Sequence, residues 1–176
     1  MVLVQLEIPI ETVEHLASLC GEEGIPLMLD PAPAHALPSK VFHHLRWFTP
    51  NETEAAFFVA QFAKDPRVRE PEQIANALLD AGVESVVLKR GSRGVYLASA
   101  HSSSHTIPAF QVEAVDTTAA GDAFNGAFAT ALMMGMEQME AARFAAAAAA
   151  ISVTRPGAQP SMPTRAEVDE LLRSHR

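Results

Sequence analysis

Short apolar runs that alternate with segments of helical periodicity constrain the fold of this chain more than any other feature. Val2 to Leu6 and Pro26 to Leu29 have the length and apolar content of strands. Between them, Glu11 to Glu23 carries apolar residues at helical spacing and is followed by Gly24. A strand, a helix and a second strand in this order are typical of a parallel sheet covered by helices. The sequence therefore predicts an α/β fold with a mostly parallel sheet.

The C-terminal part of the sheet is expected to be antiparallel. Before this antiparallel part, Arg46 to Phe48 is predicted to form one more short strand. Ser85 to Lys89 and Val95 to Ala98 are predicted to pair as a hairpin, because the segment between them contains two glycines that allow a turn. The polar segment Ala100 to His105 is predicted to be a solvated loop.

Helices and one loop fill the remaining sequence. In the first part we expect a helical stretch at Ser39 to His44, helices from Glu52 and Glu72, and a polar loop from Asp65 to Glu70. Three helices are expected to close the chain, at Ala119 to Met134, Met139 to Val153 and Thr164 to Ser174. Thr164 and Glu167 have the spacing of a capping box. Neither a repeat nor a linker interrupts the pattern, so residues 1–176 are predicted to form a single domain.

Composition excludes several classes of protein. The chain carries 13 Lys and Arg against 21 Asp and Glu, and this net charge of −8 argues against nucleic acid as a partner. The sequence has no apolar run of the roughly 18 residues that span a bilayer, so we expect no membrane insertion. Cys20 is the single cysteine, which excludes an intrachain disulfide. Met1 to Leu6 does not have the pattern of a secretory signal, and a cytoplasmic location is expected.

The segment from Val115 to Gly126 carries the strongest sign of chemistry. A strand-like lead-in runs through small residues directly into a helix, so the backbone N–H groups of Ala119 to Asp122 are expected to form an anion hole. Asp122 lies in the first helical turn, where it could accept a proton from a bound hydroxyl. Proton acceptance beside a phosphate site suggests phosphoryl transfer. The alternative is that Asp122 is only an acid favoured by the helix dipole.

Five motifs together resemble the ribokinase, or PfkB, family of carbohydrate kinases. The match covers essentially the whole chain, and the motifs follow the order of the family. They are Asp30 to Ala34, Thr49 to Glu54, Gly91 to Gly94, Asp116 to Asp122 with Phe124 to Gly126, and Thr154 to Ser161. The resemblance implies a ribokinase-like α/β fold and an ATP-dependent kinase that phosphorylates the primary hydroxyl of ribose.

The resemblance also implies roles for the helix-start residues. Asp122 would be the general base that deprotonates the sugar hydroxyl for attack on the γ-phosphate of ATP. Gly121 with Ala120 and Ala119 would supply the anion hole for the transferring group. A kinase for another sugar or a nucleoside is an alternative that the sequence does not separate from ribose.

Nucleotide and magnesium contacts are implied earlier in the chain. Asn51 would contact ATP, and Glu54 would help to organise Mg²⁺ through water. The matching nucleotide-lining segment is Lys89, Arg90, Gly91, Ser92, Arg93 and Gly94. Asn51 and Glu54 have the spacing of a helix cap with a reciprocal acid equally well. Lys89 and Arg90 could also be ordinary charges at a strand end.

A monovalent cation, K⁺, is implied beside the anion hole. The matching positions are Asp116, Thr118, Ser152, Arg155, Gly157 and Ser161. Most would act through backbone carbonyls, which makes side-chain identity a weak test. Thr118, Ser152 and Arg155 also have structural explanations. At Ala146 some relatives have a histidine near the nucleotide, so contact with the base is expected to be weaker here.

The resemblance implies that the chain is the C-terminal portion of a longer kinase. The family's diglycine sugar motif and its dimerisation lid fall in the N-terminal part, and no two glycines are adjacent here. Glu7 matches one retained sugar contact, together with Asp122, although Glu7 could also be a polar strand end. We expect a partial domain that is inactive alone, with a homo-oligomer as a possible state. The alternative of a different class is a noncatalytic nucleotide-binding or assembly module.

Overall fold

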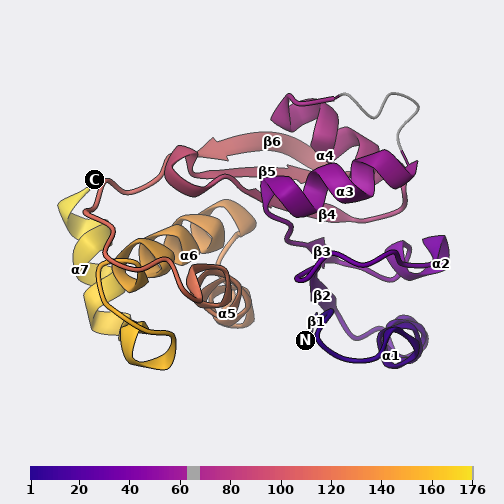
Figure 1. The fold of residues 1–176 in the computed structure, drawn as a ribbon, viewed down its shortest axis with the longest axis horizontal. Coiled ribbons are helices and arrows are strands. Elements are labelled where there is room, and N and C mark those ends of the chain that lie inside the picture. The colour runs from indigo at the N-terminus through magenta and orange to yellow at the C-terminus, as the bar shows by residue number, and fades with distance from the viewer. Residues whose placement is uncertain (63–67, 176) are drawn as a thin grey trace. The chain divides into compact units, whose positions relative to one another are not determined.

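A six-stranded sheet runs through the computed structural model, which describes residues 1–62 and 68–175 (Figure 1). The strands lie side by side in the order in which they occur along the chain. They are β1 (Val2–Gln5), β2 (Leu27–Asp30), β3 (Trp47–Phe48), β4 (Ser85–Lys89), β5 (Val95–Ser99) and β6 (Ser102–Ile107).

The first four strands are parallel, as the sequence predicts. Gln5 pairs with Asp30 in the register of β1 and β2, and Asn51 forms an isolated parallel bridge with Lys89. All four residues of β2 are buried, which explains its apolar sequence. The carboxyl ends of these strands meet at one edge of the sheet, where open α/β folds bind ligands.

The last three strands are antiparallel, and here one prediction is wrong. The segment Ala100 to His105 was expected to be a loop, but Ser102–Ile107 forms β6. Residues 102–104 and 106 are exposed, because β6 is the last strand in the order of the described sheet. An edge strand is held by backbone pairing to its neighbour and needs no apolar pattern, so a reading based on hydrophobic periodicity misses it.

Four helices accompany the strands in the first part of the chain. They are α1 (Ile10–Glu22), α2 (Ser39–Phe42), α3 (Glu52–Phe62) and α4 (Pro71–Asp80). Helices α3 and α4 pack against one another and against β4 (Figure 1). Of the loop predicted from Asp65 to Glu70, residues 65–67 lie outside the described residues.

An aromatic cluster forms part of the hydrophobic core beneath α3. Phe58 and Phe48 are fully buried, with ring centroids 5.2 Å apart. Phe42 from α2 contacts both rings edge-on, and Phe62 at the end of α3 contacts Phe42 at 4.7 Å. Edge-to-face pairs of this kind add to the burial of apolar area. The cluster fixes α3, and with it the strand-to-helix turn at Asn51.

The C-terminal helices are α5 (Ala120–Met133), α6 (Gln138–Ser152) and α7 (Arg165–Ser174). Helices α5 and α6 pack together, and the buried alanines of α6 explain the run from Ala145 to Ala150. The predicted capping box is confirmed: the Glu167 N–H donates to the Thr164 hydroxyl, and the Thr164 N–H donates to Glu167 Oε2. The helix predicted to end at Met134 ends at Met133, and Gly135 follows it with φ +83°.

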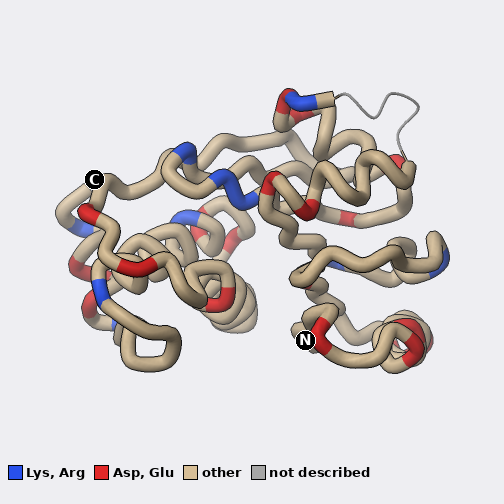
Figure 2. Tube along the Cα trace, in the orientation of Figure 1, with Lys and Arg blue, Asp and Glu red and all other residues tan. Residues whose placement is uncertain are grey.

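The described residues divide into two compact units. The first consists of Met1–Arg90 with Tyr96–Thr106, and the second consists of Gly91–Val95 with the residues from Ile107 onwards. Acidic and basic residues are interspersed along the trace of both (Figure 2). None of the helices within residues 1–62 and 68–175 is both long and apolar enough to cross a membrane. The prediction of a single domain stays a prediction.

Candidate functional site

The predicted site residues divide between the two units. Glu7, Asn51, Glu54, Lys89 and Arg90 lie in the first unit, and all the others lie in the second. Each group is therefore described within its own unit.

A buried ion pair marks the carboxyl edge of the parallel strands in the first unit. Lys89 Nζ, at the end of β4, lies 3.0 Å from Asp30 Oδ1, at the end of β2. The side chains are 14% and 3% exposed. Gln5, opposite Asp30 in β1, donates to Asp30 Oδ2 at 3.4 Å. The sequence predicted a role for Lys89 but not for Asp30, although a carboxylate that ends a fully buried strand was a signal.

Asn51 and Glu54 form the helix cap that the spacing allowed. Asn51 donates to both carboxylate oxygens of Glu54, through its backbone N–H and its Nδ2, each at 2.7 Å. The Glu54 N–H donates to Asn51 Oδ1 at 2.9 Å. The pKa of Glu54 is raised, because burial disfavours the charged form more than the Asn51 bond and Lys89 favour it. Asn51 is exposed even though it caps α3, so its role as a helix cap is compatible with contact to a ligand.

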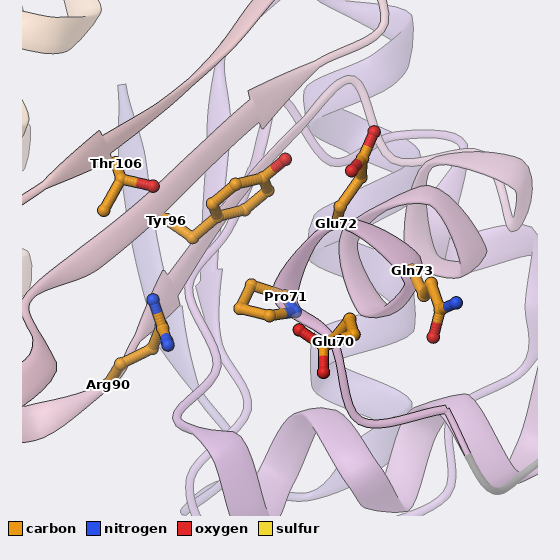
Figure 3. A pocket seen from close by; sticks show the side chains of 7 residues that line it. All are labelled: Glu70, Pro71, Glu72, Gln73, Arg90, Tyr96 and Thr106. Carbon is orange, nitrogen blue, oxygen red and sulfur yellow. The ribbon is translucent and has the colours of Figure 1, made fainter.

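Arg90 lines a hollow that the sequence did not reveal. The hollow has a volume of about 440 Å³ and lies between the start of α4 and strands β5 and β6 (Figure 3). Its lining residues are Glu70, Pro71, Glu72, Gln73, Arg90, Tyr96 and Thr106. Arg90 Nε lies 3.8 Å from Glu52 Oε1, in the first turn of α3. Glu7, the predicted sugar contact, is exposed just after β1.

The predicted turn from Gly91 to Gly94 lies in the second unit and forms the short 3-10 helix η1 (Gly91–Arg93). The Gly94 N–H donates to the Gly91 carbonyl at 3.0 Å. Both glycines have positive φ, +55° at Gly91 and +83° at Gly94. A Cβ on Gly94 would lie 2.0 Å from the Ile107 carbonyl oxygen, whereas one on Gly91 would meet nothing within 4 Å. Glycine is therefore required at position 94 for both conformation and space.

Asp116 ties the loop before α5 to the loop after α6. Its Oδ1 accepts from the Thr118 N–H at 2.9 Å and from the Thr118 hydroxyl at 2.6 Å. Its Oδ2 accepts from the Gly157 N–H at 2.8 Å. These hydrogen bonds lower the pKa of Asp116 to about 2, and the bond from the Thr118 hydroxyl has the largest effect. Three of the predicted cation-site residues are thus brought together.

The predicted anion hole lies at the start of α5, where the backbone has an unusual conformation. Ala119 has φ +58°, the only positive φ at a non-glycine among the described residues. This conformation costs about 1–2 kcal/mol for a residue with a Cβ. No side chain caps the helix at Ala119, and the Ala120 N–H donates to the Thr117 carbonyl at 3.2 Å. Asp122 lies in this first turn and is exposed.

The other predicted cation-site side chains form local structural bonds. Ser152 Oγ donates to the Ala149 carbonyl, and Ser161 Oγ donates to the Ala158 carbonyl. Arg155 pairs with Glu167. A cation site that uses backbone carbonyls stays a prediction. Within the part of the chain that the structure describes, no three His, Cys, Asp or Glu side chains are grouped to hold a metal.

We expect stability to fall in acid because of Asp116 and Glu167, both of which have a pKa lowered to about 2. A carboxyl group whose pKa is lowered by folding stabilises the folded state when the pH is above the ordinary carboxyl pKa. This stabilisation is lost as the pH falls towards 2. The free energy of unfolding should therefore be smaller at pH 3 than at pH 6. Denaturant titrations at both pH values would measure this.

Asp116→Asn should reduce that loss of stability between pH 6 and pH 3. Glu113→Gln is the control for the loss of a nearby exposed negative charge alone. If Asp116→Asn kept the full difference between the two pH values, the contribution of Asp116 would be refuted.

Residues 2–165 match the family model described as pfkB family carbohydrate kinase. The chain is 43% identical over 170 residues to a ribokinase of Haemophilus influenzae and 44% identical over 172 residues to a ribokinase of Bacillus subtilis. These matches cover 97% and 98% of the chain. The chain spans about 55% of the length of each of these curated relatives.

Solved structures give the same result. A Thermotoga maritima ribokinase superposes with a TM-score of 0.87 at 43% identity, covering 97% of this chain and 56% of that one. An Arabidopsis thaliana ribokinase complexed with ribose and ATP superposes with a TM-score of 0.87 at 34% identity, covering 97% and 55%. The predicted α/β fold is confirmed by these similarities.

Proposed function

The chain belongs to the pfkB family of carbohydrate kinases, and from this premise we propose that the protein transfers the γ-phosphate of ATP to the primary hydroxyl of ribose. The observation that carries the proposal is the uncapped start of α5, where a left-handed Ala119 precedes Asp122. Ribose is favoured as acceptor because the relatives above are ribokinases and one is complexed with ribose and ATP.

In this proposal Asp122 accepts the proton of the sugar hydroxyl as the oxygen attacks the γ-phosphorus. A base that is correctly placed contributes about 100-fold to 10,000-fold. The N–H groups of Ala119, Ala120 and Gly121 stabilise the negative charge on the transferring phosphoryl group. Glu7 is the proposed sugar contact of the first unit.

The nucleotide contacts are proposed separately for each unit. In the first unit they are Asn51, Lys89 and Arg90, and Glu54 is the proposed partner of Mg²⁺ through water. Its buried carboxylate keeps acceptor capacity beyond the two Asn51 bonds, which suits a hydrated cation. When bound, Mg²⁺ would neutralise phosphate charge. In the second unit the proposed contacts are Gly91, Ser92, Arg93 and Gly94, with Gly121 and Asp122.

A direct assay tests the proposed reaction. In a protein of the relatives' full length that carries these residues, ribose, ATP and Mg²⁺ should give ADP and ribose 5-phosphate, and phosphorus NMR would follow the reaction. Deoxyribose, a nucleoside and fructose 6-phosphate are the comparison acceptors. Preference for one of these would replace ribose as the substrate, and calorimetry without any heat of binding for Mg-ATP would refute the kinase proposal.

Potassium is expected to increase activity or nucleotide binding more than sodium does. The Val153 carbonyl accepts from the N–H groups of Val115 and Asp116, at 2.7 and 3.1 Å, so the loops on either side of the proposed cation are already joined. A cation there would add positive charge beside the anion hole. ATP titrations in potassium, sodium and a large organic cation at matched ionic strength would measure the effect. Equal results in all three would contradict it.

A further inference from the structure

The Asp30–Lys89 pair differs from the exposed ion pairs of the same unit. The Asp30 side chain is 3% exposed, and the residue occupies the last position of a fully buried strand. By contrast, the Lys40–Glu14 pair has a similar distance, 2.9 Å, but side-chain exposures of 70% and 25%. Burying two charges costs solvation free energy that their attraction offsets only in part. Stability is therefore a weak explanation for a charged pair at this position.

The buried pair lies beside the proposed nucleotide and magnesium residues. Asn51 bridges to Lys89 across the strand ends, and the Lys89 N–H donates to the Pro50 carbonyl at 2.8 Å. The charges of Lys89 and Asp30 both act on Glu54, Lys89 to favour its carboxylate and Asp30 to disfavour it. The Asp30–Lys89 pair therefore lies within electrostatic range of Glu54 in α3, at the carboxyl edge of the sheet.

We propose that Asp30 is a positioning residue that holds the Lys89 ammonium ready to bind the polyphosphate of ATP. This inference rests on the proposed function. An ammonium has three N–H donors, and the pair with Asp30 uses one direction, which leaves donors for a phosphate oxygen. A lysine that is already ordered loses less conformational entropy when the ligand binds.

Removal of the Asp30 charge separates positioning from simple electrostatics. A negative charge near a phosphate site repels the negatively charged ATP. If Asp30 had no positioning role, its carboxylate would therefore weaken ATP binding in the wild-type protein. Its removal would then tighten binding. If Asp30 positions Lys89, its removal weakens binding instead, because the ammonium must be ordered by the ligand. The two explanations predict opposite signs.

The experiment is a double-mutant cycle on the dissociation constant of Mg-ATP, measured by calorimetry on the purified protein. We expect Asp30→Asn to weaken binding by about tenfold. In the Lys89→Met background the same substitution should cause no weakening, because no ammonium is left to position. Glu14→Gln, which breaks the exposed pair with Lys40, is the matched control and should leave binding unchanged.

Asp30→Glu keeps the charge but moves it, and should also weaken binding. Calorimetric stoichiometry and thermal unfolding of each variant report the folded fraction. The double variant Asp30→Asn/Lys89→Met removes both charges, so neither partner is left as an unpaired buried charge. Unchanged or tighter binding by Asp30→Asn, or equal weakening in both backgrounds, would overturn the positioning role and leave the kinase proposal intact. Absence of ATP binding by the wild-type protein would overturn both.

Discussion

Asp122→Asn is expected to lower kcat for ribose phosphorylation by about 100-fold to 10,000-fold. Asparagine keeps the size of the side chain at the start of α5 but cannot accept the proton of the attacking hydroxyl. The dissociation constant of Mg-ATP should stay nearly unchanged, because the N–H groups of Ala119 to Gly121 are retained. Single-turnover kinetics together with calorimetry would separate the two effects.

The control separates a general base from an acid that only interacts with the helix dipole. Glu140 is also an acid in a first helical turn, that of α6, in the same unit. Glu140→Gln should leave kcat unchanged, and a dipole effect alone costs only about 0.3–1 kcal/mol of stability. Because the chain spans about 55% of the length of its curated relatives, the rates should be measured in a protein of the relatives' full length that carries these residues. Turnover by Asp122→Asn at the wild-type rate would remove Asp122 as the base.

Gly94→Ala is expected to lower the free energy of unfolding by about 2–5 kcal/mol, because it combines an unfavourable positive φ with overpacking. The new Cβ would lie 2.0 Å from the Ile107 carbonyl oxygen and 2.7 Å from the Ala109 nitrogen. Both are backbone atoms, so a rotamer change cannot relieve the overlap. Denaturant unfolding of the variant measures the loss.

Gly91→Ala is the matched control in the same turn. Its φ is also positive, but its Cβ would have open space around it. We expect a loss of about 1 kcal/mol, mainly from the left-handed conformation. Similar losses for both variants would show that the close approach of the Ile107 backbone does not determine the requirement for glycine at position 94.

Local rules explain which features the sequence predicted correctly. Buried parallel strands must be apolar, so β1, β2 and β4 were recognisable, and α1 was recognisable from its apolar spacing. The caps at Asn51 and Thr164 follow from residues only three positions apart, and such contacts need no tertiary information. The helix start at Asp122 was likewise visible as small residues that lead into an apolar helix.

The features that the sequence did not reveal depend on residues far apart in the chain. β6 exists because β5 offers it a backbone partner, and the Asp30–Lys89 pair joins residues 59 positions apart. The hollow beside Arg90 needs α4, β5 and β6 together. Sequence by itself thus determined the elements other than β6, the caps at Asn51 and Thr164, and the family. Only the tertiary structure decided which distant charges meet, because burial and pairing are properties of the packed strands and not of any local segment.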